Sequence, residues 1–540
     1  MKKIIIILLF LILYSVAANA QKTPGFGLFT DRDIYVSGET LLAKIYIPEA
    51  NSSRIIYLDL VNRYGTRISG VPLEIRNSQA DGFLILPDSL STGNYLLRTY
   101  QKHNAGKQMV MREIWISNRF DEPGKTIEMN RVENLNKIQE KESNQISIEG
   151  IEQQYQINQP FGSNIKINPT FLNEIDGELI VSVAQTDPSF AADAFLLQSD
   201  SGNDGMPEKR GIILSGIVTD KKTNEAATNI TVYLTIPDTV PGFQYYNTKK
   251  DGRFYFLLDK YYGSVEAVIQ CFGNTPDQRL KISLDDLFAA AGELPEFRQE
   301  PIQETFRNNT VRNIDAVTFQ KVFAQKQIIL NAPVLTNQKT YPYYGKATET
   351  VDPQLFIDLP DFTEISRELL PGVKFRNYNN EPTLQVLNSQ LRYFFEEAPL
   401  LLIDGIPIRD LNVIKDMGTS DIDRVDICRS ERFYGDLRFP GVVAIYTTKS
   451  DYPMLSESDQ LIRLTLETIQ ETVSLAETNI PEPNIPDLRQ VVYWNPKVKP
   501  AENISVKCSI SSVQGLYKII VRGKLKDGTL FFSEKQFEVK

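Results

Sequence analysis

Short apolar segments that alternate with polar residues recur along most of the chain, and this pattern restricts the fold more than any other feature. Residues 29–48, 54–68 and 93–101 each combine β-branched and aromatic residues with a turn signal such as Ser-Gly, Tyr-Gly or Gly-Asn. A period of two places every second side chain on one face of a strand, and frequent turns favour antiparallel sheets. At 540 residues the chain is too long for one core, so the pattern predicts several small β-sandwich domains in a string.

The first twenty residues carry the three parts of a secretory signal peptide. Two lysines follow the initial Met, an apolar run extends from Ile4 to Val16, and Ala18-Asn19-Ala20 fits a cleavage site. The run falls short of the ~20 apolar residues of a spanning helix, so we expect residues 1–20 to be cleaved rather than kept as an anchor. No cysteine follows the cleavage site for a lipid anchor, and no later stretch is long and apolar enough to span a membrane as a helix. The sequence therefore predicts export through the inner membrane to the periplasm or outer membrane, with the cell surface as a further destination.

Charge and cysteine content argue against several classes of site. The formal net charge is −10 and Lys and Arg form no concentrated face, which argues against a nucleic-acid partner. The three cysteines, Cys271, Cys428 and Cys508, lie far apart and lack the C-x-x-C spacing of zinc sites. We expect buried free thiols, while one disulfide between two of the three stays open.

The motifs that carry catalysis are absent from the sequence. His103 is the single histidine, beside an Asn-Ala-Gly turn, and neither a G-x-S-x-G elbow nor an H-E-x-x-H motif is present. No P-loop or G-x-G-x-x-G stands between a strand and a helix. We therefore predict a protein that is not an enzyme, with no catalytic, cofactor-binding or metal-binding residue and no cofactor. A glycosidase pair of carboxylates stays open, because such pairs meet only in the fold.

A motif near the N-terminus resembles a known family. The run Asp31-Arg32-Asp33-Ile34-Tyr35-Val36-Ser37-Gly38-Glu39 is similar to the D-R-x-x-Y-x-x-G-E signature of macroglobulin-like domains, and Gly93-Asn94-Tyr95 is similar to their later G-x-Y strand. The resemblance implies a macroglobulin-like β-sandwich over residues 21–117 and a second such domain over residues 146–205. Macroglobulins that trap proteases carry a C-x-E-Q thioester, which none of the three cysteines begins. A protease inhibitor is therefore the least favoured function.

Two further stretches resemble domains of outer-membrane transporters. Residues 213–258 contain a Gly-x-Val strand, a Lys-Thr-Asn turn and an Asp-Gly-Arg-Phe strand start, and they resemble the carboxypeptidase regulatory-like domain. That resemblance implies a small β-sandwich over residues 210–275. Residues 399–411 and 421–449 contain I-D-G-x-P, I-x-x-V-x-I, Y-G and G-V-V-x-I-x-T pieces that resemble the plug domain of TonB-dependent receptors. They imply an α+β plug-like domain over residues 346–450.

Two local features of the plug-like region have a direct physical interpretation. Asp361 precedes an apolar pattern of helical spacing, which predicts a capped helix that ends at Pro371-Gly372. Asp404 and Gly405 lie between two apolar strands, where Asp and Gly supply turn geometry. We interpret Asp404 as a turn residue rather than a general base, because the flanking segments offer no group to orient it and no acid or nucleophile to act with it.

The remaining segments are assigned by composition and periodicity. Residues 118–145 are rich in Glu, Asn, Lys and Gln and predict a linker, and residues 276–345 predict a linker with helical segments. Residues 451–485 have a polar, helical pattern, and the alternation in residues 486–540 predicts a separate C-terminal β-sandwich. The expected fold class is mainly β: a string of small β-sandwich domains plus one α+β plug-like domain.

A receptor plug fills a barrel of the same chain, and this chain leaves little room for one. Only 91 residues follow Lys449 (540 minus 449), far fewer than about twenty-two strands of ~9–11 residues require. We therefore expect the plug-like domain to stand free or to dock on a separate polypeptide.

The combination of these domains resembles a group of exported proteins of Bacteroidetes-type bacteria. It implies a non-enzymatic envelope protein that acts by protein–protein contact, as a scaffold or accessory partner in transport, assembly or secretion. The expected partner is an outer-membrane barrel protein or another envelope protein, contacted through the plug-like domain and its sheet edges. The sequence names no partner-binding residue. The alternative is a cell-surface adhesin or glycan-binding protein, because residues 515–540 also resemble the sorting domains of type IX secretion.

Overall fold

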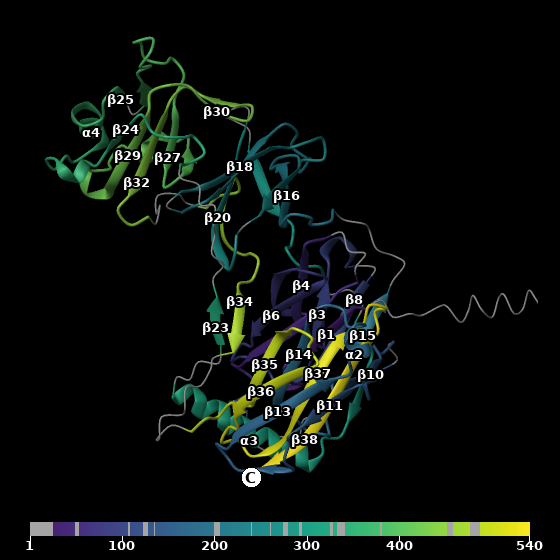
Figure 1. The fold of residues 1–540 in the computed structure, drawn as a ribbon. Helices are drawn as coiled ribbons and strands as arrows, with labels where there is room; N and C mark the ends of the chain where they lie inside the picture. The colour runs from purple at the N-terminus through teal and green to yellow at the C-terminus, as the bar shows by residue number, and fades with distance from the viewer. Residues whose placement is uncertain are drawn as a thin grey trace, which may run out of the picture. The chain divides into compact units, whose positions relative to one another are not determined.

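The chain divides into two compact units, which are described separately below (Figure 1). Unit 1 comprises Met1–Ile212, Phe288–Pro333 and Thr468–Lys540, and unit 2 comprises Ile213–Leu287 and Val334–Glu467. The predicted signal peptide, residues 1–20, lies outside the described residues. The computed structural model describes residues 25–48, 53–105, 108–121, 128–133, 136–198, 206–238, 240–259, 261–273, 279–290, 294–323, 328–331, 341–378, 381–450, 457–475 and 486–540.

The first sandwich of unit 1 is built from the alternating strands of the N-terminal region. Its smaller sheet has the order β1 (Gly27–Thr30), β3 (Thr40–Tyr46), β6 (Gln79–Ile85). Its larger sheet has the order β15 (Ala194–Gln198), β8 (Gln108–Ser117), β7 (Gly93–Tyr100), β4 (Ile55–Asn62), β5 (Arg67–Glu74), with β2 (Ile34–Val36) parallel to β8. Every second side chain faces inward, so Leu41, Leu58 and Ile114 meet in one buried core.

The second sandwich of unit 1 combines strands from distant parts of the chain. One sheet has the order β10 (Glu140–Glu142), β38 (Leu530–Val539), β37 (Gly515–Lys524), β14 (Leu179–Gln185), β35 (Val491–Val498), with β12 (Gln154–Tyr155) also on β38. The other has the order β11 (Ile146–Glu149), β13 (Pro160–Ile167), β36 (Asn503–Ser509). A short helix, α2 (Pro169–Leu172), connects β13 to β14. Figure 1 shows the C-terminal strands, in yellow, among the blue strands of the earlier segment.

This arrangement corrects the predicted domain map. The prediction of separate domains over residues 146–205 and 486–540 is wrong, because β13 pairs with β36 along its whole length and β14 lies between β35 and β37. The segment 194–198 also leaves its predicted domain and pairs with β8 of the first sandwich. Alternation in a sequence reports which face of a strand is buried, but it does not report which strand lies beside it.

The two sandwiches of unit 1 pack against each other and against one long helix. A shared apolar cluster joins them, with Tyr46 and Phe83 from the first and Trp494 from the second. The helix α3 (Glu304–Val322) places Phe306 against Trp115, with ring centroids 5.4 Å apart. Unit 1 also contains the short helix η1 (Lys102–Asn104) and two small paired elements: β9 (Met129–Val132) with β22 (Phe297–Glu300), and β23 (Ile328–Asn331) with β34 (Thr472–Leu475).

Unit 2 begins with a third sandwich, which starts at β16. One sheet has the order β19 (Arg253–Leu258), β16 (Ile212–Asp220), β21 (Leu280–Leu284). The other has the order β18 (Gly242–Asn247), β17 (Thr231–Ile236), β20 (Ser264–Phe272), β33 (Leu461–Glu467). β33 follows the α+β domain in the sequence, so this sandwich too is built from two distant segments of the chain.

The rest of unit 2 is an α+β domain, residues 341–450, in the region predicted to be plug-like. Its five-stranded sheet has the order β24 (Glu349–Val351), β29 (Ile422–Cys428), β32 (Val442–Thr447), β27 (Leu400–Ile403), β28 (Ile406–Ile408). Around it lie α4 (Phe362–Glu368), η2 (Pro353–Leu355), η3 (Leu411–Val413), η4 (Thr419–Asp421) and the hairpins β25 (Val373–Tyr378)–β26 (Glu381–Val386) and β30 (Arg432–Tyr434)–β31 (Leu437–Phe439). The predicted helix cap is confirmed: the Asp361 carboxylate accepts a hydrogen bond from Glu364 N at 2.9 Å.

The protein is thus mainly β, a string of small sandwiches as predicted, but the segments assigned as linkers are wrong. Residues 118–145 contain β9 and β10, which pair with β22 and β38. In residues 276–345 the predicted helical segment is confirmed as α3, but the linker assignment is wrong because β21 belongs to the third sandwich. The helical prediction for residues 451–485 is wrong where the structure describes them, at 457–475, because this part forms β33 and β34. The strand signal was present in the sequence, because Ile462, Leu464 and Leu466 of β33 alternate with polar residues.

Candidate docking surface

The five-stranded sheet of the α+β domain ends in two different edge strands. β28 is one of them, and it is covered: its residues are buried, and Pro407 O accepts a hydrogen bond from Gln270 Nε2 of β20 at 2.9 Å. β24 is the other, and among the strands that the structure describes it pairs only with β29. Its central residue, Thr350, is exposed. An unpaired edge presents backbone N–H and C=O groups to other chains, so β24 is the edge open to a partner.

The chain continues from β24 along the same side of β29. Val351 pairs with Val425, and three residues later Gln354 Nε2 donates a hydrogen bond to Ile422 O at 3.2 Å. Asp352 caps this turn, because its carboxylate accepts a hydrogen bond from Gln354 N at 3.0 Å. The segment after Gln354 is therefore held beside the end of the open edge.

Three consecutive large apolar side chains follow at this position. Leu355, Phe356 and Ile357 are 78%, 58% and 69% exposed. Scattered single apolar residues are ordinary on protein surfaces, whereas a contiguous apolar patch marks an interaction site more often. We call residues 355–357 the apolar run.

The flanking contacts keep the apolar run on the surface. Pro353 is buried before it, and Leu359 is buried after it. Leu359 N donates to Thr419 Oγ1 at 3.2 Å, and Thr419 N donates to Leu359 O at 3.0 Å. The Thr419 hydroxyl in turn donates to Asp358 Oδ1 at 2.7 Å. Because both ends are tied to the domain, the run cannot turn inward without breaking these hydrogen bonds.

The surroundings of the apolar run are strongly acidic. Residues 347–366 contain five carboxylates, Glu349, Asp352, Asp358, Asp361 and Glu364, and no Lys or Arg. The neighbouring η4 and the start of β29 add two exposed carboxylates, Asp421 and Asp423. The surface therefore combines apolar side chains with a negative rim.

Asp404 occupies the turn that the sequence predicts. It has a φ of +49° between β27 and β28, and its carboxylate accepts hydrogen bonds from Thr447 N at 2.8 Å and from Thr447 Oγ1 at 2.7 Å. A short carboxylate tolerates this left-handed conformation better than most side chains do. Its contacts fix the turn to the neighbouring strand β32, so Asp404 has a structural role.

The other residues considered from the sequence are divided between the two units. His103 lies in η1 of unit 1, and the three thiols are unpaired. Cys271 and Cys428 are buried in unit 2, and Cys508 is half-buried in unit 1. Burial raises the pKa of Cys271 and of Cys508 to about 12, so neither thiol is poised as a nucleophile at neutral pH.

The macroglobulin-like motif, residues 31–39, makes buried hydrogen bonds and an ion pair inside unit 1. Tyr35 Oη donates to Asp31 Oδ1 at 2.8 Å, and Arg32 pairs with Glu39 at 2.8 Å. Arg32 Nη1 also donates to Gln490 Oε1 at 2.8 Å, and Gln490 Nε2 donates to Asn313 O at 3.4 Å. The motif thus links the first sandwich to the C-terminal segment and to α3.

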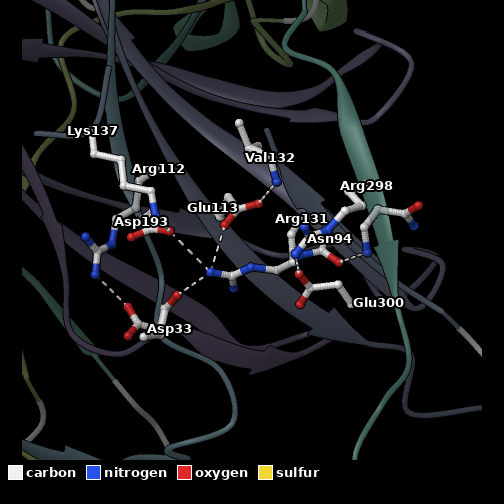
Figure 2. Close-up of polar contacts among 12 residues, drawn as sticks. Asp33, Asn94, Arg112, Glu113, Arg131, Val132, Lys137, Asp193, Arg298 and Glu300 are labelled. Carbon is white, nitrogen blue, oxygen red and sulfur yellow. Dashed lines mark hydrogen bonds and ion pairs between the residues drawn. The ribbon is translucent and has the colours of Figure 1, made fainter. Parts of the chain in front are cut away.

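A second charged network lies on the first sandwich (Figure 2). Glu113 Oε1 accepts a hydrogen bond from Val132 N at 2.6 Å, and Arg131 Nη2 lies 3.3 Å from Glu113 Oε2 and 3.4 Å from Asp193 Oδ2. Burial raises the pKa of Glu113 to about 7, against the opposing effect of Arg131. Perturbed carboxyls occur at catalytic sites, but these contacts tie β9 to the sandwich. We interpret the shift as a consequence of structural burial.

The sequence reasoning missed the apolar run. It recognised the helix cap at Asp361 but gave no role to Leu355, Phe356 and Ile357 before it. The signal was present as three adjacent large apolar residues between Asp352 and Asp358, with neither the period of two of a half-buried strand nor the period of a helix. Such a run also fits a buried strand, and only the fold shows that it is exposed.

Within the parts of the chain that the structure describes, no group of three or more His, Cys, Asp or Glu residues could hold a metal ion. In the same parts of the chain, every helix is too short or too polar to cross a membrane.

Comparison with known proteins gives weak structural likenesses. No protein-family model matches the sequence, and no curated protein matches it. Among solved structures, Salmonella α2-macroglobulin reacted with methylamine is similar at 8% identity and a TM-score of 0.22, over 95% of this chain and 39% of that one. The native conformation of Escherichia coli α2-macroglobulin is similar at 8% identity and a TM-score of 0.22, over 95% of this chain and 40% of that one. This chain therefore spans about two fifths of the length of these macroglobulins.

A repeat protein gives a third likeness. The tetra-tandem repeat from the extending region of a large adhesion protein is similar at 9% identity and a TM-score of 0.13, over 93% of this chain and 96% of that one. TM-scores this low do not establish a shared fold. The architecture of this protein accordingly rests on its own strand order and register.

Proposed function

We propose that this protein is a non-enzymatic, exported component of the bacterial envelope, and that it works by protein–protein contact through its α+β domain. Its partner is an outer-membrane barrel protein or another envelope protein, which it assists as a scaffold or accessory subunit in transport, assembly or secretion. The observation that most directly supports this proposal is the apolar run beside the open edge of β24. A folded domain that holds three adjacent apolar side chains in water gains by covering them with a partner.

Two further features support this proposal. The N-terminal sequence has the charge, apolar run and Ala-x-Ala site of an export signal, which agrees with a partner in the envelope. The candidate catalytic groups, Asp404, His103 and the three cysteines, are divided between the two units, and the contacts of Asp404 stabilise a turn. A protein whose exposed apolar surface is anchored in place is suited to docking.

The test is comparative purification from the native bacterium. Leu355, Phe356 and Ile357 are changed together to Ser, and tagged wild-type and variant chains are recovered from detergent-solubilised outer membranes after cross-linking. We expect one barrel or other envelope protein to accompany the wild type in a fixed ratio and to be lost from the variant, because its apolar contact area is gone. Recovery of the same partner in the same ratio with the variant would contradict the proposal.

A matched control and a compartment test accompany this experiment. Leu391→Ser together with Phe433→Ser removes two other exposed apolar side chains of the α+β domain, and it should leave the partner bound. Brief protease treatment of intact cells distinguishes the adhesin alternative, because only a protein on the cell surface releases fragments. Surface release with no membrane partner would favour an adhesin or glycan-binding protein.

A further inference from the structure

We propose that the open edge of β24 takes up an extended, basic segment of the partner as an added β-strand, and that the apolar run anchors its apolar side chains. This inference rests on the proposed function and names the chemistry of the partner segment. The partner segment is expected to alternate apolar residues with Lys or Arg and to continue past the end of β24.

The two edges of the sheet differ in a way that selects β24. At β28 a proline occupies the middle of the strand and removes one N–H group, and Gln270 of the third sandwich takes the Pro407 carbonyl oxygen. At β24 the middle residue is Thr350, which is exposed on the side chain and retains its N–H group. Addition of a strand supplies backbone hydrogen bonds without a preformed pocket, and it needs an edge that no other strand of the domain uses.

The apolar run lies where a strand added to β24 would continue. β24 pairs with residues 425–427 of β29, and Gln354 contacts Ile422 farther along that strand. A partner strand that follows the edge of β24 therefore reaches Leu355, Phe356 and Ile357 after the last residue of β24. Alternate side chains of an added strand face one side, so its apolar residues can cover the run while the others face the rim.

The charge of the rim selects a basic segment. The stretch 347–366 has five carboxylates and no Lys or Arg. Glu349 is paired with Arg429, so Asp352, Asp358, Asp361 and Glu364 form the rim, and Asp423 adds an exposed carboxylate beside the Ile422 contact. An acidic segment brought to this edge would meet like charges, whereas Lys and Arg would be attracted and steered to it. Exposed charges are screened by salt, so the attraction should weaken as ionic strength rises.

The test uses the full chain without its signal peptide and two synthetic peptides. In one peptide Val and Lys alternate, and in the other Val and Glu alternate. We expect the Val-Lys peptide to bind, with hydrogen exchange slowed at residues 349–357, and the Val-Glu peptide to bind at least about tenfold more weakly. Equal binding of both peptides, or slowed exchange confined to another part of the chain, would overturn the inference.

A charge-reversal pair completes the experiment. Asp423→Lys should weaken binding of the Val-Lys peptide about three- to fivefold at low salt, and the loss should shrink as salt is raised. Glu396→Lys, at an exposed acid outside this edge, should leave binding within about twofold. If the membrane partner depends on the apolar run but Asp423→Lys has no effect and β24 is not protected, the proposed function stands and the basic-strand inference falls. If the partner ignores the apolar run, the proposed function itself falls.

Discussion

The sandwiches of unit 1 and the α+β domain of unit 2 both have apolar cores, but they differ in where their ion pairs lie. Among the described residues, the ion pairs with both side chains nearly inaccessible lie in unit 1, as with Arg98 and Asp59, both 0% exposed. The core of the α+β domain is apolar, with Phe362, Ile365 and Ile445 all 0% exposed, and its ion pairs are solvent-accessible. Both parts also expose apolar side chains, as at Val322 in unit 1, but in the α+β domain three of them, residues 355–357, are consecutive. Unit 1 therefore buries ion pairs, whereas the ion pairs of the α+β domain are accessible to solvent.

The difference indicates which substitutions should test the stability of the fold and which should test binding to a partner. Buried ion pairs fix the positions of strands, but removal of one partner leaves the other charge buried without a counter-charge. Exposed apolar side chains contribute little to folding, so they can be changed without loss of the fold. The predictions below test this contrast, from the largest expected effect to the smallest.

Removal of residues 486–540 should unfold the second sandwich completely. The segment supplies β35, β36, β37 and β38, so β13 and β14 lose every main neighbour strand except β11. Hydrogen exchange should show loss of protection over residues 146–185. The control replaces residues 341–450, which lie in unit 2, with a flexible Gly-Ser linker and should keep that protection. Persistent protection after removal of 486–540 would contradict the single-sandwich architecture.

Arg98→Met should destabilise unit 1 by about 3–5 kcal/mol, because it leaves the Asp59 carboxylate buried without its cation. Arg98 donates to both oxygens of Asp59, at 2.7 and 2.6 Å. Urea unfolding measures the change, and the double variant with Asp59→Leu should recover most of it. In the α+β domain, Arg429→Met removes the partly exposed pair with Glu349 and should cost no more than about 1 kcal/mol. Equal costs at the two pairs would break the comparison.

Unit 1 should lose stability as the pH rises from about 4.5 to about 7. Burial raises the pKa of Glu113 from 4.5 to about 7, so in this window the folded state holds a proton that the unfolded chain has released. The stabilisation is full below the unfolded pKa and declines by up to about 3 kcal/mol as the pH passes through the window. Burial also raises the pKa of Asp31 to about 6, which acts in the same direction. Unfolding measured across pH should show the decline, and Glu113→Gln should reduce its slope.

Asp404→Ala should destabilise unit 2 by about 1–3 kcal/mol, because Thr447 loses two hydrogen bonds and Ala must adopt a positive φ. Asp404→Asn keeps a residue that tolerates this conformation, so it should cost less. Thermal unfolding measures both changes. An Asp404→Ala variant as stable as the wild type would contradict the structural role assigned to this carboxylate.

The smallest stability change is expected at the apolar run. Phe356→Ser should alter the unfolding free energy by no more than about 0.5 kcal/mol, because the ring is mostly exposed in the folded chain. Denaturant unfolding checks this value. A loss comparable to that at Arg98 would mean that the ring supports the fold and would remove it as a contact residue.

Sequence periodicity located most strands but few of their partners. The alternation in residues 29–101 predicted the first sandwich, and local chemistry predicted the Asp361 cap and the Asp404 turn, since these features depend on neighbours within a few residues. The pairing of β13 with β36 joins residues more than 300 positions apart, and no local pattern encodes that separation. The helix prediction for residues 451–485 overlooked the period of two in β33 and β34, and the structure pairs these strands with β20 and β23.

The sequence by itself determined that this chain is mainly β, that its strands are short, and where its sharpest turns and its helix cap lie, because those properties follow from side-chain period and backbone preference. Only the tertiary structure decided which segments share a core, which ion pairs are buried and which apolar residues remain in water. Burial is a property of what packs from elsewhere in the chain. For that reason Arg98 forms a buried ion pair, whereas Leu355, Phe356 and Ile357 are exposed on the surface.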